Sequence, residues 1–286
     1  MVKEEKNLSL QSVSIIGVGY VGLSTSVGFA AKGYTVLIYD NDPAKIDLLS
    51  KGLSPFYEPE LEKHLQQTGK DGFLTSASSV EEAVTNTDIT FVAVGTPSKP
   101  DGTINLNHIK DSVTEIGKAL TKKANYHLVV IKSTVIPGTT INLVKPLLEK
   151  HSNKLCSIDF GLCMNPEFLR EGSGFYDTIH PNRIIIGEYD KKSGDTLKSL
   201  YNQFHTEERP PILRTNPSTA ELIKYANNAF LATKISYINT IANICEKIPE
   251  TDIQTVAKAI GLDKRINPKF LRAGLGYGGS CFPKDL

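Results

Sequence analysis

The chain has 286 residues, of which 40% are apolar and 22% are charged, and its formal net charge is +1. Its length favours two globular units, and a nearly balanced charge without long blocks of one sign argues against binding to nucleic acid or membrane surfaces. No apolar run approaches the roughly 18 residues of a membrane helix. The first residues also lack the apolar core of a secretory signal. We therefore expect a cytoplasmic protein.

Short β-branched runs alternate with longer amphipathic stretches from Ser12 to about Thr215. Six runs predict strands, namely "SVSIIG", "YTVLIYD", "DITFVAVG", "HLVVIKS", "FGLCMN" and "NRIIIG". This alternation is typical of a parallel sheet covered by helices. The predicted class is α/β, with a Rossmann-like, doubly wound parallel sheet in residues 1–214.

Two helices within this region have clear start signals. In "SSVEEAV" a capping box is expected from Ser79 to Glu82. In "NDPAKIDLLSKG" the proline at position 43 lies in the first turn and Gly52 follows the end, as is common at helix termini.

The pattern changes after "RPPILRTNPST", which predicts a proline-rich turn region where the strands cease. Residues 219–246 carry apolar side chains at three- and four-residue spacing, which predicts one long helix. A second helix is expected from Thr251 to Gly261. Residues 215–286 are thus predicted to form a long central helix and the start of an all-α middle domain.

The first predicted strand ends in "IIGVGYVG", in which Gly17, Gly19 and Gly22 have the GxGxxG spacing. Glycines at these positions allow a tight turn and let backbone N–H groups approach a pyrophosphate at a helix N-terminus. Asp40 ends the second predicted strand about twenty residues later, where a carboxylate accepts the ribose hydroxyls of NAD and repels the extra phosphate of NADP. The pattern predicts NAD as the cofactor.

Four cysteines are present, Cys156, Cys163, Cys245 and Cys281, with no CxxC pair, and the histidines show no HxxxH spacing. These spacings predict no metal site. Three of the thiols are expected to be small core residues. Cys281 differs because it lies among glycines and beside a Lys-Asp pair in "LGYGGSCFPKDL", which is an unusual setting for a buried thiol.

Eight motifs taken together resemble those of the nucleotide-sugar dehydrogenases, that is, the UDP-glucose/GDP-mannose dehydrogenase family. In chain order they are "GVGYVGL", "YEPEL", "VGTP", "KSTVIPGT", "NPEFLREG", "PNRIIIG", "KYANNAF" and "KFLRAGLGYGGSCFPKD". The resemblance runs from about Val13 to Leu286 and looks closest to the UDP-glucose branch. The loops "VGTP" and "KSTVIPGTT" could by themselves be ordinary turns. With the resemblance, the candidate NAD-binding residues are Gly17, Gly19, Tyr20, Val21, Gly22, Asp40, Lys45, Gly95, Thr96, Pro97, Ser133, Thr134 and Glu171.

The resemblance implies a four-electron oxidation of the sugar C6 alcohol of UDP-glucose to the carboxylate with two NAD+. Cys281 would be the nucleophile that traps the aldehyde as a thiohemiacetal and then becomes a thioester. Lys224 and Asn228 stand at i and i+4 of the long helix, so they share one face, and the resemblance implies that they stabilise the oxyanion at C6. Alone, that spacing could be a solvated polar face.

Further roles follow from the same resemblance. Glu167 would activate the hydrolytic water, and Thr134 and Asp285 would position waters and Lys224. Arg265 would reach the substrate of an adjacent subunit, which implies a homodimer through the central helix. The candidate substrate-binding residues are Glu167, Phe168, Leu169, Arg170, Lys224, Asn228, Arg265, Phe270, Arg272, Tyr277 and Gly278.

Several alternatives stay open at this point. The substrate could be GDP-mannose or UDP-N-acetylmannosamine. A two-electron β-hydroxyacid dehydrogenase also pairs a Rossmann domain with a Lys-x-x-x-Asn helix, but it needs no cysteine. Members of the resembled family continue beyond "PKD" with a UDP-binding domain, so we expect the chain to be a fragment. We expect such a fragment to bind NAD but to turn over poorly or not at all. A further alternative is a non-catalytic NAD-binding module.

Overall fold

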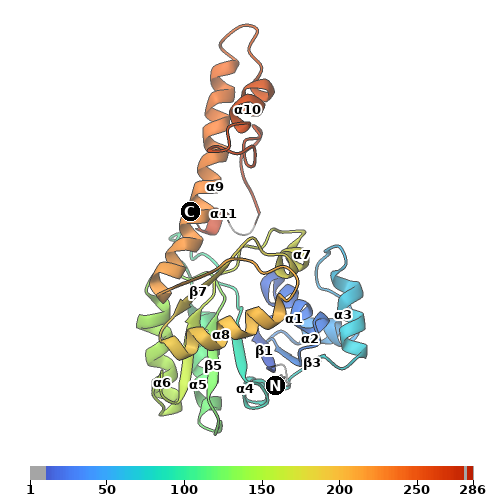
Figure 1. The fold of residues 1–286 in the computed structure, drawn as a ribbon, viewed down its shortest axis with the longest axis vertical. Helices are drawn as coiled ribbons and strands as arrows, with labels where there is room; N and C mark the ends of the chain where they lie inside the picture. The colour runs from blue at the N-terminus through green and yellow to red at the C-terminus, as the bar shows by residue number, and fades with distance from the viewer. Residues whose placement is uncertain (1–10, 280–281, 286) are drawn as a thin grey trace, which may run out of the picture. The chain divides into compact units, whose positions relative to one another are not determined.

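The structure, a computed structural model, describes residues 11–279 and 282–285. The chain divides into two compact units, one up to Leu222 and one from Ile223 onward. The first unit contains an eight-stranded sheet of order β3-β2-β1-β4-β5-β6-β7-β8 (Figure 1). Its strands are β1 (Val13–Ile16), β2 (Val36–Tyr39), β3 (Leu74–Ser76), β4 (Ile89–Val92), β5 (His127–Ile131), β6 (Phe160–Met164), β7 (Ile184–Glu188) and β8 (Ile212–Thr215). The predicted α/β class is confirmed.

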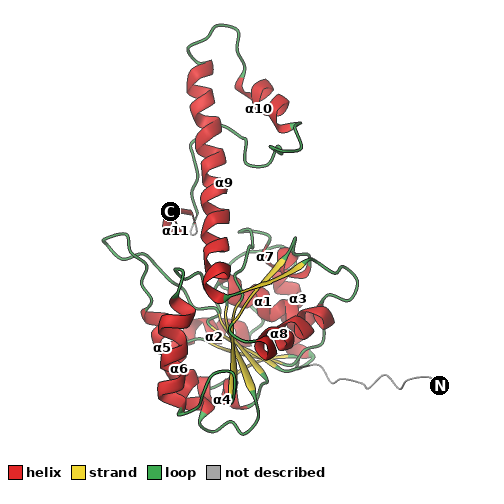
Figure 2. Cartoon of the chain, turned by 60° about the vertical axis from the view of Figure 1, so that its left-hand side comes forward, coloured by secondary structure: helices red, strands yellow, loops and turns green. Residues whose placement is uncertain are grey.

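Helices cover both faces of this sheet, as the doubly wound pattern requires. Figure 2 shows α4, α5 and α6 on one face and α1, α3 and α8 on the other. The helices of the first unit are α1 (Tyr20–Ala31), α2 (Pro43–Ser50), α3 (Leu61–Lys70), α4 (Val80–Thr85), α5 (Asn107–Leu120), the π-helix η1 (Thr140–Val144), α6 (Lys145–Ser152), α7 (Gly174–Ile179) and α8 (Lys191–Phe204).

Aromatic packing joins the two ends of the first unit's sequence. The ring of Phe29 lies 5.3 Å from that of Tyr34, 5.6 Å from that of Phe91 and 4.7 Å from that of Phe204, measured between centroids. All four side chains are almost fully buried. Each such side chain removes roughly 150–250 Å² from water, so this cluster is a main part of the core beneath α1 and α8.

All six predicted strands are present, but the prediction of an entirely parallel sheet is wrong for one pair. β6 and β7 are antiparallel, with Met164 opposite Gly187, whereas the other neighbours are parallel. The helix between them, α7, has six residues and spans about 9 Å. It is too short to carry the chain back across the sheet, so β7 starts at the edge where β6 ends.

Two strands were not predicted. β8 lies inside the expected turn region, where Ile212–Thr215 pair in parallel with Ile184–Gly187 of β7. It forms the edge of the sheet, and prolines are tolerated at the start of an edge strand. β3 forms the opposite edge with only three residues. β3 is too short for its alternation to be recognisable, whereas β8 is as long as β1 and was missed because the prolines directly before it predicted a turn.

The predicted helix caps are largely confirmed. Pro43 begins α2, and the Asp42 side chain accepts a hydrogen bond from Ala44 N. The Ser79 hydroxyl accepts from Glu82 N at 3.1 Å, but the Glu82 carboxylate accepts from the Ser78 amide at 2.7 Å. The reciprocal half of the capping box is therefore shifted by one residue.

The second unit is helical, as predicted. The long helix α9 (Pro217–Cys245) begins in the first unit and continues into the second, followed by α10 (Ile253–Gly261) and α11 (Phe282–Asp285). Asp252 caps α10 by accepting from Thr255 N at 2.7 Å. None of the helices in the described ranges has the length and apolar character that crossing a membrane requires.

The expected core thiols are confirmed for Cys156 and Cys163, which are buried, whereas Cys245 is half-buried. Burial raises the pKa of the Cys156 thiol to about 12. Such a thiol is unreactive, because the thiolate is the nucleophilic form.

A buried carboxylate fixes the start of α9. Glu221 is fully buried and accepts hydrogen bonds from Gly138 N at 2.5 Å, Thr140 N at 2.8 Å and the Thr140 hydroxyl at 2.6 Å. These donors follow β5, so the carboxylate ties that loop to the helix. Burial raises the pKa of Glu221 despite these donors.

A cluster of buried polar side chains lies on the neighbouring strands β1, β4 and β5. His127 Nε2 lies 2.8 Å from the Thr90 hydroxyl, which lies 2.7 Å from the Ser14 hydroxyl, and His127 Nδ1 lies 3.0 Å from Thr87 O. Burial lowers the pKa of His127 to about 3, and the nearby charge of Lys123 acts in the same direction. The imidazole is therefore neutral in the folded state at neutral pH.

We predict that acid destabilises the fold through His127. Between about pH 6.5 and pH 3 the unfolded chain binds a proton that the folded chain excludes, so the free energy of unfolding falls by roughly 1.4 kcal/mol per pH unit. In His127→Gln this slope should be smaller, although the variant is less stable at pH 7. Denaturant unfolding from pH 7 to pH 4.5 measures it, with the exposed His108→Gln as control. Equal slopes for wild type and His127→Gln would contradict the assignment.

Candidate functional site

Four loops meet at one edge of the sheet. β1, β4, β5 and β6 are parallel neighbours, so their carboxyl ends lie side by side. The loops that follow them contain residues 17–19, 94–97, 132–134 and 165–169. In open α/β sheets, ligands bind at this edge.

The three glycines of the GxGxxG motif have different structural roles. Gly17 has φ +95°, and a Cβ there would lie 2.8 Å from the backbone of Val94. A Cβ at Gly22 would lie 1.8 Å from Gly17 O, whereas at Gly19 it would meet nothing within 4 Å. The first and third glycines therefore permit close packing, and the second leaves open space at the N-terminus of α1. These features fit a dinucleotide pyrophosphate.

Asp40 is held in place at the end of β2. Its Oδ2 accepts from Val18 N at 2.8 Å, and its Oδ1 accepts from Asp42 N at 3.0 Å. Lys45 Nζ lies 3.4 Å from the same carboxylate, whose side chain is only 6% exposed. The turn thus orients the carboxylate beside the glycine loop. Both lie at a cavity of about 370 Å³ whose lining includes Gly17, Gly19, Asp40, Lys45, Gly95 and His108.

The loops after β4 and β5 are bonded to one another. The Thr96 hydroxyl donates to Thr134 O at 2.8 Å, and the Ser133 hydroxyl donates to Val94 O at 2.7 Å. Gly95 and Pro97 are exposed beside these bonds. The predicted NAD-binding loops are therefore brought together, with hydroxyls that hold their spacing.

The loop after β6 is compact. Glu167 is buried, and its Oε2 accepts from Leu169 N at 2.6 Å. Arg170 forms an ion pair with Asp177, with 2.6 Å between Nη2 and Oδ1, and Glu171 is exposed in the following turn.

Tyr20, from the glycine motif, also holds this loop. Its hydroxyl donates to Arg170 O and accepts from Gly174 N at 2.7 Å. A Cβ at Gly174 would lie 2.7 Å from that hydroxyl oxygen, so a larger residue there would displace the end of the Tyr20 side chain.

In the second unit, two motifs far apart in the sequence are joined. Asn228 Nδ2 donates to Asp285 Oδ2 at 2.7 Å, across 57 positions, and both side chains are buried. Lys284 pairs with the other oxygen of Asp285, and Lys224 is buried on the same helix as Asn228. The predicted contact of Asp285 with Lys224 stays a prediction.

The other candidates of the second unit are exposed. Arg265 pairs with Asp263 at 2.6 Å. Four further candidates are also exposed, namely Phe270, Arg272, Tyr277 and Gly278. Cys281 lies outside the described residues.

Residues 11–205 match the model of the NAD-binding domain of the UDP-glucose/GDP-mannose dehydrogenase family, and residues 218–286 match the model of its central domain. The chain belongs to this family. The resemblance inferred from the motifs is confirmed, and with it a family of NAD-dependent nucleotide-sugar dehydrogenases.

Relatives of this family differ in the sugar nucleotide that they are named for. The chain is 48% identical to UDP-glucose 6-dehydrogenase YwqF of Bacillus subtilis over 96% of its own length and 60% of the relative's. It is 41% identical to a GDP-mannose 6-dehydrogenase of Pseudomonas savastanoi over 96% and 62%.

Among solved structures, a UDP-glucose dehydrogenase from Pyrobaculum islandicum matches with a TM-score of 0.92 at 42% identity, over 98% of this chain and 63% of that one. The chain therefore spans about 60% of the length of the curated relatives it matches.

The structure also shows polar residues close to the candidate site that were not predicted from the sequence. Lys132, Asn165 and Tyr201 form a buried hydrogen-bonded group beneath the loop of Glu167. One signal was available, because Lys132 directly follows a run of four apolar residues, and a buried lysine there needs a partner.

We predict that Asp40 decides between NAD and NADP. Asp40→Ala should weaken NAD binding roughly 10- to 100-fold, as expected for lost hydrogen bonds to a charged group. Asp40→Asn keeps an acceptor for Val18 N–H and should chiefly relax discrimination against NADP. Calorimetry with each dinucleotide measures both effects, and Asp47→Ala on α2 is the control. Unchanged affinities in both Asp40 variants would refute the role.

Proposed function

We propose that the protein oxidises the C6 alcohol of UDP-glucose to the carboxylate of UDP-glucuronate, with two NAD+ per substrate. The observation that carries the proposal is the buried bond between Asn228 and Asp285, because it unites the "KYANN" and "FPKD" motifs. The identity of 48% to a UDP-glucose 6-dehydrogenase supports this choice of substrate.

NAD+, when bound, supplies the hydride acceptor for each oxidation. Gly17, Gly19 and the start of α1 would hold its pyrophosphate, and Asp40 would accept its ribose hydroxyls. The loops of Thr96 and Ser133 would border its remaining part.

Lys224 and Asn228 would stabilise negative charge at the C6 oxygen. They lie one turn apart on α9, and both side chains are buried. Fixed donors in a site without water stabilise a developing oxyanion more strongly than water does. The Asn228 amide is already oriented, since its bond to Asp285 uses one of its two N–H donors.

Cys281 would carry the intermediate. After the first hydride leaves C6 and the hydroxyl proton leaves the oxygen on C6, the thiolate sulfur bonds to the aldehyde carbon and the carbonyl oxygen becomes the thiohemiacetal oxyanion. Loss of the second hydride leaves a thioester. Water then adds to its carbonyl carbon with Glu167 taking the water proton, the C–S bond breaks, and the carboxylate and the thiol are released. A reducing compartment keeps a catalytic thiol free, so we propose that the reaction is cytoplasmic.

The sugar nucleotide would contact two sets of residues. The first set comprises the backbone groups of Phe168 and Leu169, together with Arg170. The second set comprises Phe270, Arg272, Tyr277 and Gly278, whose exposure suits contact with a ligand.

GDP-mannose is the second candidate substrate, because a relative at 41% identity is named for it. Comparing kcat/KM for UDP-glucose, UDP-N-acetylmannosamine and GDP-mannose separates the candidates. A preference for either alternative would replace UDP-glucose without changing the proposed chemistry.

We also propose a homodimer through α9. Phe230, Tyr237 and Ile244 recur at heptad spacing and are 65%, 53% and 47% exposed. Large apolar side chains aligned on one helix face are typical of a helix-packing interface. Exposed Arg265 would then reach the substrate of the partner subunit.

We predict two NADH per UDP-glucose consumed, with no free aldehyde. Cys281→Ser should block completion, since a serine hydroxyl is a much weaker nucleophile than a thiolate. Absorbance at the NADH band and chromatography of the sugar nucleotide measure this, and Cys245→Ser is the control. A ratio of one NADH with free aldehyde, or an unchanged rate in Cys281→Ser, would exclude the mechanism. NAD binding without turnover of any sugar nucleotide would favour a binding module.

For the dimer, Tyr237→Glu should halve the mass measured by light scattering, because a buried carboxylate in an apolar interface is unfavourable. The exposed Glu246→Gln at the end of α9 is the control. A monomeric wild type, or a dimer that survives Tyr237→Glu, would refute the interface.

A further inference from the structure

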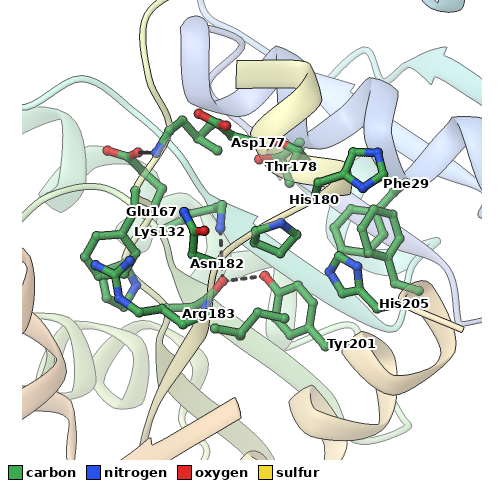
Figure 3. A pocket seen from close by; sticks show the side chains of 18 of the residues that line it. Phe29, Lys132, Glu167, Asp177, Thr178, His180, Asn182, Arg183, Tyr201 and His205 are labelled. Carbon is green, nitrogen blue, oxygen red and sulfur yellow. Dashed lines mark hydrogen bonds between the residues drawn. The ribbon is translucent and has the colours of Figure 1, made fainter. Parts of the chain in front are cut away.

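Three polar side chains meet beneath the loop that carries Glu167. Lys132 Nζ donates to Asn165 Oδ1 at 3.0 Å, and the Tyr201 hydroxyl donates to the same oxygen at 2.5 Å (Figure 3). Lys132 is 8% exposed and Asn165 2%. Lys132 follows β5, Asn165 follows β6 and Tyr201 lies on α8, so the contact joins three elements at the carboxyl edge of the sheet.

The Asn165 amide has no freedom to rotate. Its oxygen accepts the two bonds just described, and its Nδ2 donates to Ile185 O of β7 at 2.8 Å. A rotated amide would place its N–H₂ group against Lys132 and Tyr201 and leave several buried groups unpaired, at roughly 1–3 kcal/mol for each. Asn165 is therefore locked in one orientation.

The next residues of the loop are also held. Pro166 has a fixed φ, and the guanidinium of Arg183 lies 3.8 Å from the centroid of the Phe168 ring. Glu167 lies between these two anchors, and its Oε2 accepts from Leu169 N. Both ends of residues 165–168 are thus anchored by cations of other elements, Lys132 and Arg183.

The bond from Lys132 also sets a spacing. Lys132 is two residues before Thr134, and Asn165 is two residues before Glu167. Burying an ammonium group costs free energy that an apolar side chain of similar length would avoid, so stability alone does not account for a lysine here. What the lysine adds is a directional, charge-assisted bond between two loops.

We propose that Lys132 is a positioning residue that fixes the Glu167 loop relative to the loop of Thr134. Its effect on turnover rests on the proposed function, whereas its effect on the order of the loop does not. Lys132 acts through Asn165.

The chain offers a matched control at the opposite edge of the sheet. Lys123 precedes β5, is partly buried, and donates to Thr85 O at 2.8 Å and to Thr87 O. Lys123→Met and Lys132→Met therefore make the same chemical change at the two ends of one strand.

Hydrogen exchange of the intact protein, followed by mass spectrometry, tests the positioning directly. In Lys132→Met, exchange at residues 167–172 should accelerate roughly tenfold, as expected for the loss of one charge-assisted bond. Lys132→Arg should restore most of the protection, and Lys123→Met should accelerate exchange only near its own partners.

Tyr201→Phe, which removes the other bond to Asn165 Oδ1, should produce a smaller acceleration in the same peptide. If Lys132→Met does not fold, the Tyr201→Phe variant tests the proposal in its place. Equal exchange of residues 167–172 in the Lys132→Met and Lys123→Met variants, or no change with Tyr201→Phe where Lys132→Met is unfolded, would overturn the proposal.

Turnover supplies the second measurement. With UDP-glucose, Lys132→Met should lower kcat at least roughly tenfold while the KM for NAD stays unchanged, because a misplaced Glu167 slows chemistry, whereas the NAD-binding loop after β5 keeps its bonds to Val94 O and to the Thr96 hydroxyl. A KM for NAD that rises with an unchanged kcat would overturn the proposal. If the wild type oxidises no sugar nucleotide, the proposed function fails, and the exchange result still decides the role of Lys132.

Discussion

The parallel pairing of β1, β4, β5 and β6 is the constraint on which the rest of the site depends. Ile89 pairs with both Val13 and Leu128, so the register runs without a break through the centre of the sheet. The residues of these four strands are all buried. Parallel strands end together, and this brings the glycine loop and the loops that follow β4, β5 and β6 to one edge.

Polar side chains then fix the distances between those loops. Thr96 bonds the loop after β5, Ser133 bonds the loop after β4, and Lys132 bonds Asn165 after β6. Each bond joins neighbouring loops, so the loops that follow β4, β5 and β6 are all connected to one another. Sites built on such supported loops hold their geometry without rearrangement when a ligand binds, which is a requirement for stabilising a transition state.

Local patterns predicted the parts of the molecule that depend on short-range physics. The glycine turn, the cap of α2 and the apolar spacing of α9 each involve a few consecutive residues. The antiparallel direction of β7 was missed, because strand direction depends on whether a connecting helix is long enough to cross the sheet. The edge strand β8 was missed, because the prolines directly before it predicted a turn. The partner of Asp285 was also open, since Asn228 lies 57 positions away.

The sequence by itself determined the family, the order of the elements and the identity of nearly all candidate residues, because motifs such as "GGSCFPKD" and "NPEFLREG" combine rare residue types at fixed spacing. Only the tertiary structure decided which of these residues touch. The joining of Asn165 to Lys132 and Tyr201, and of Asn228 to Asp285, could not be read from spacing, because such contacts arise from packing between distant segments. Buried polar groups must find partners, and only the folded chain determines which ones lie within reach.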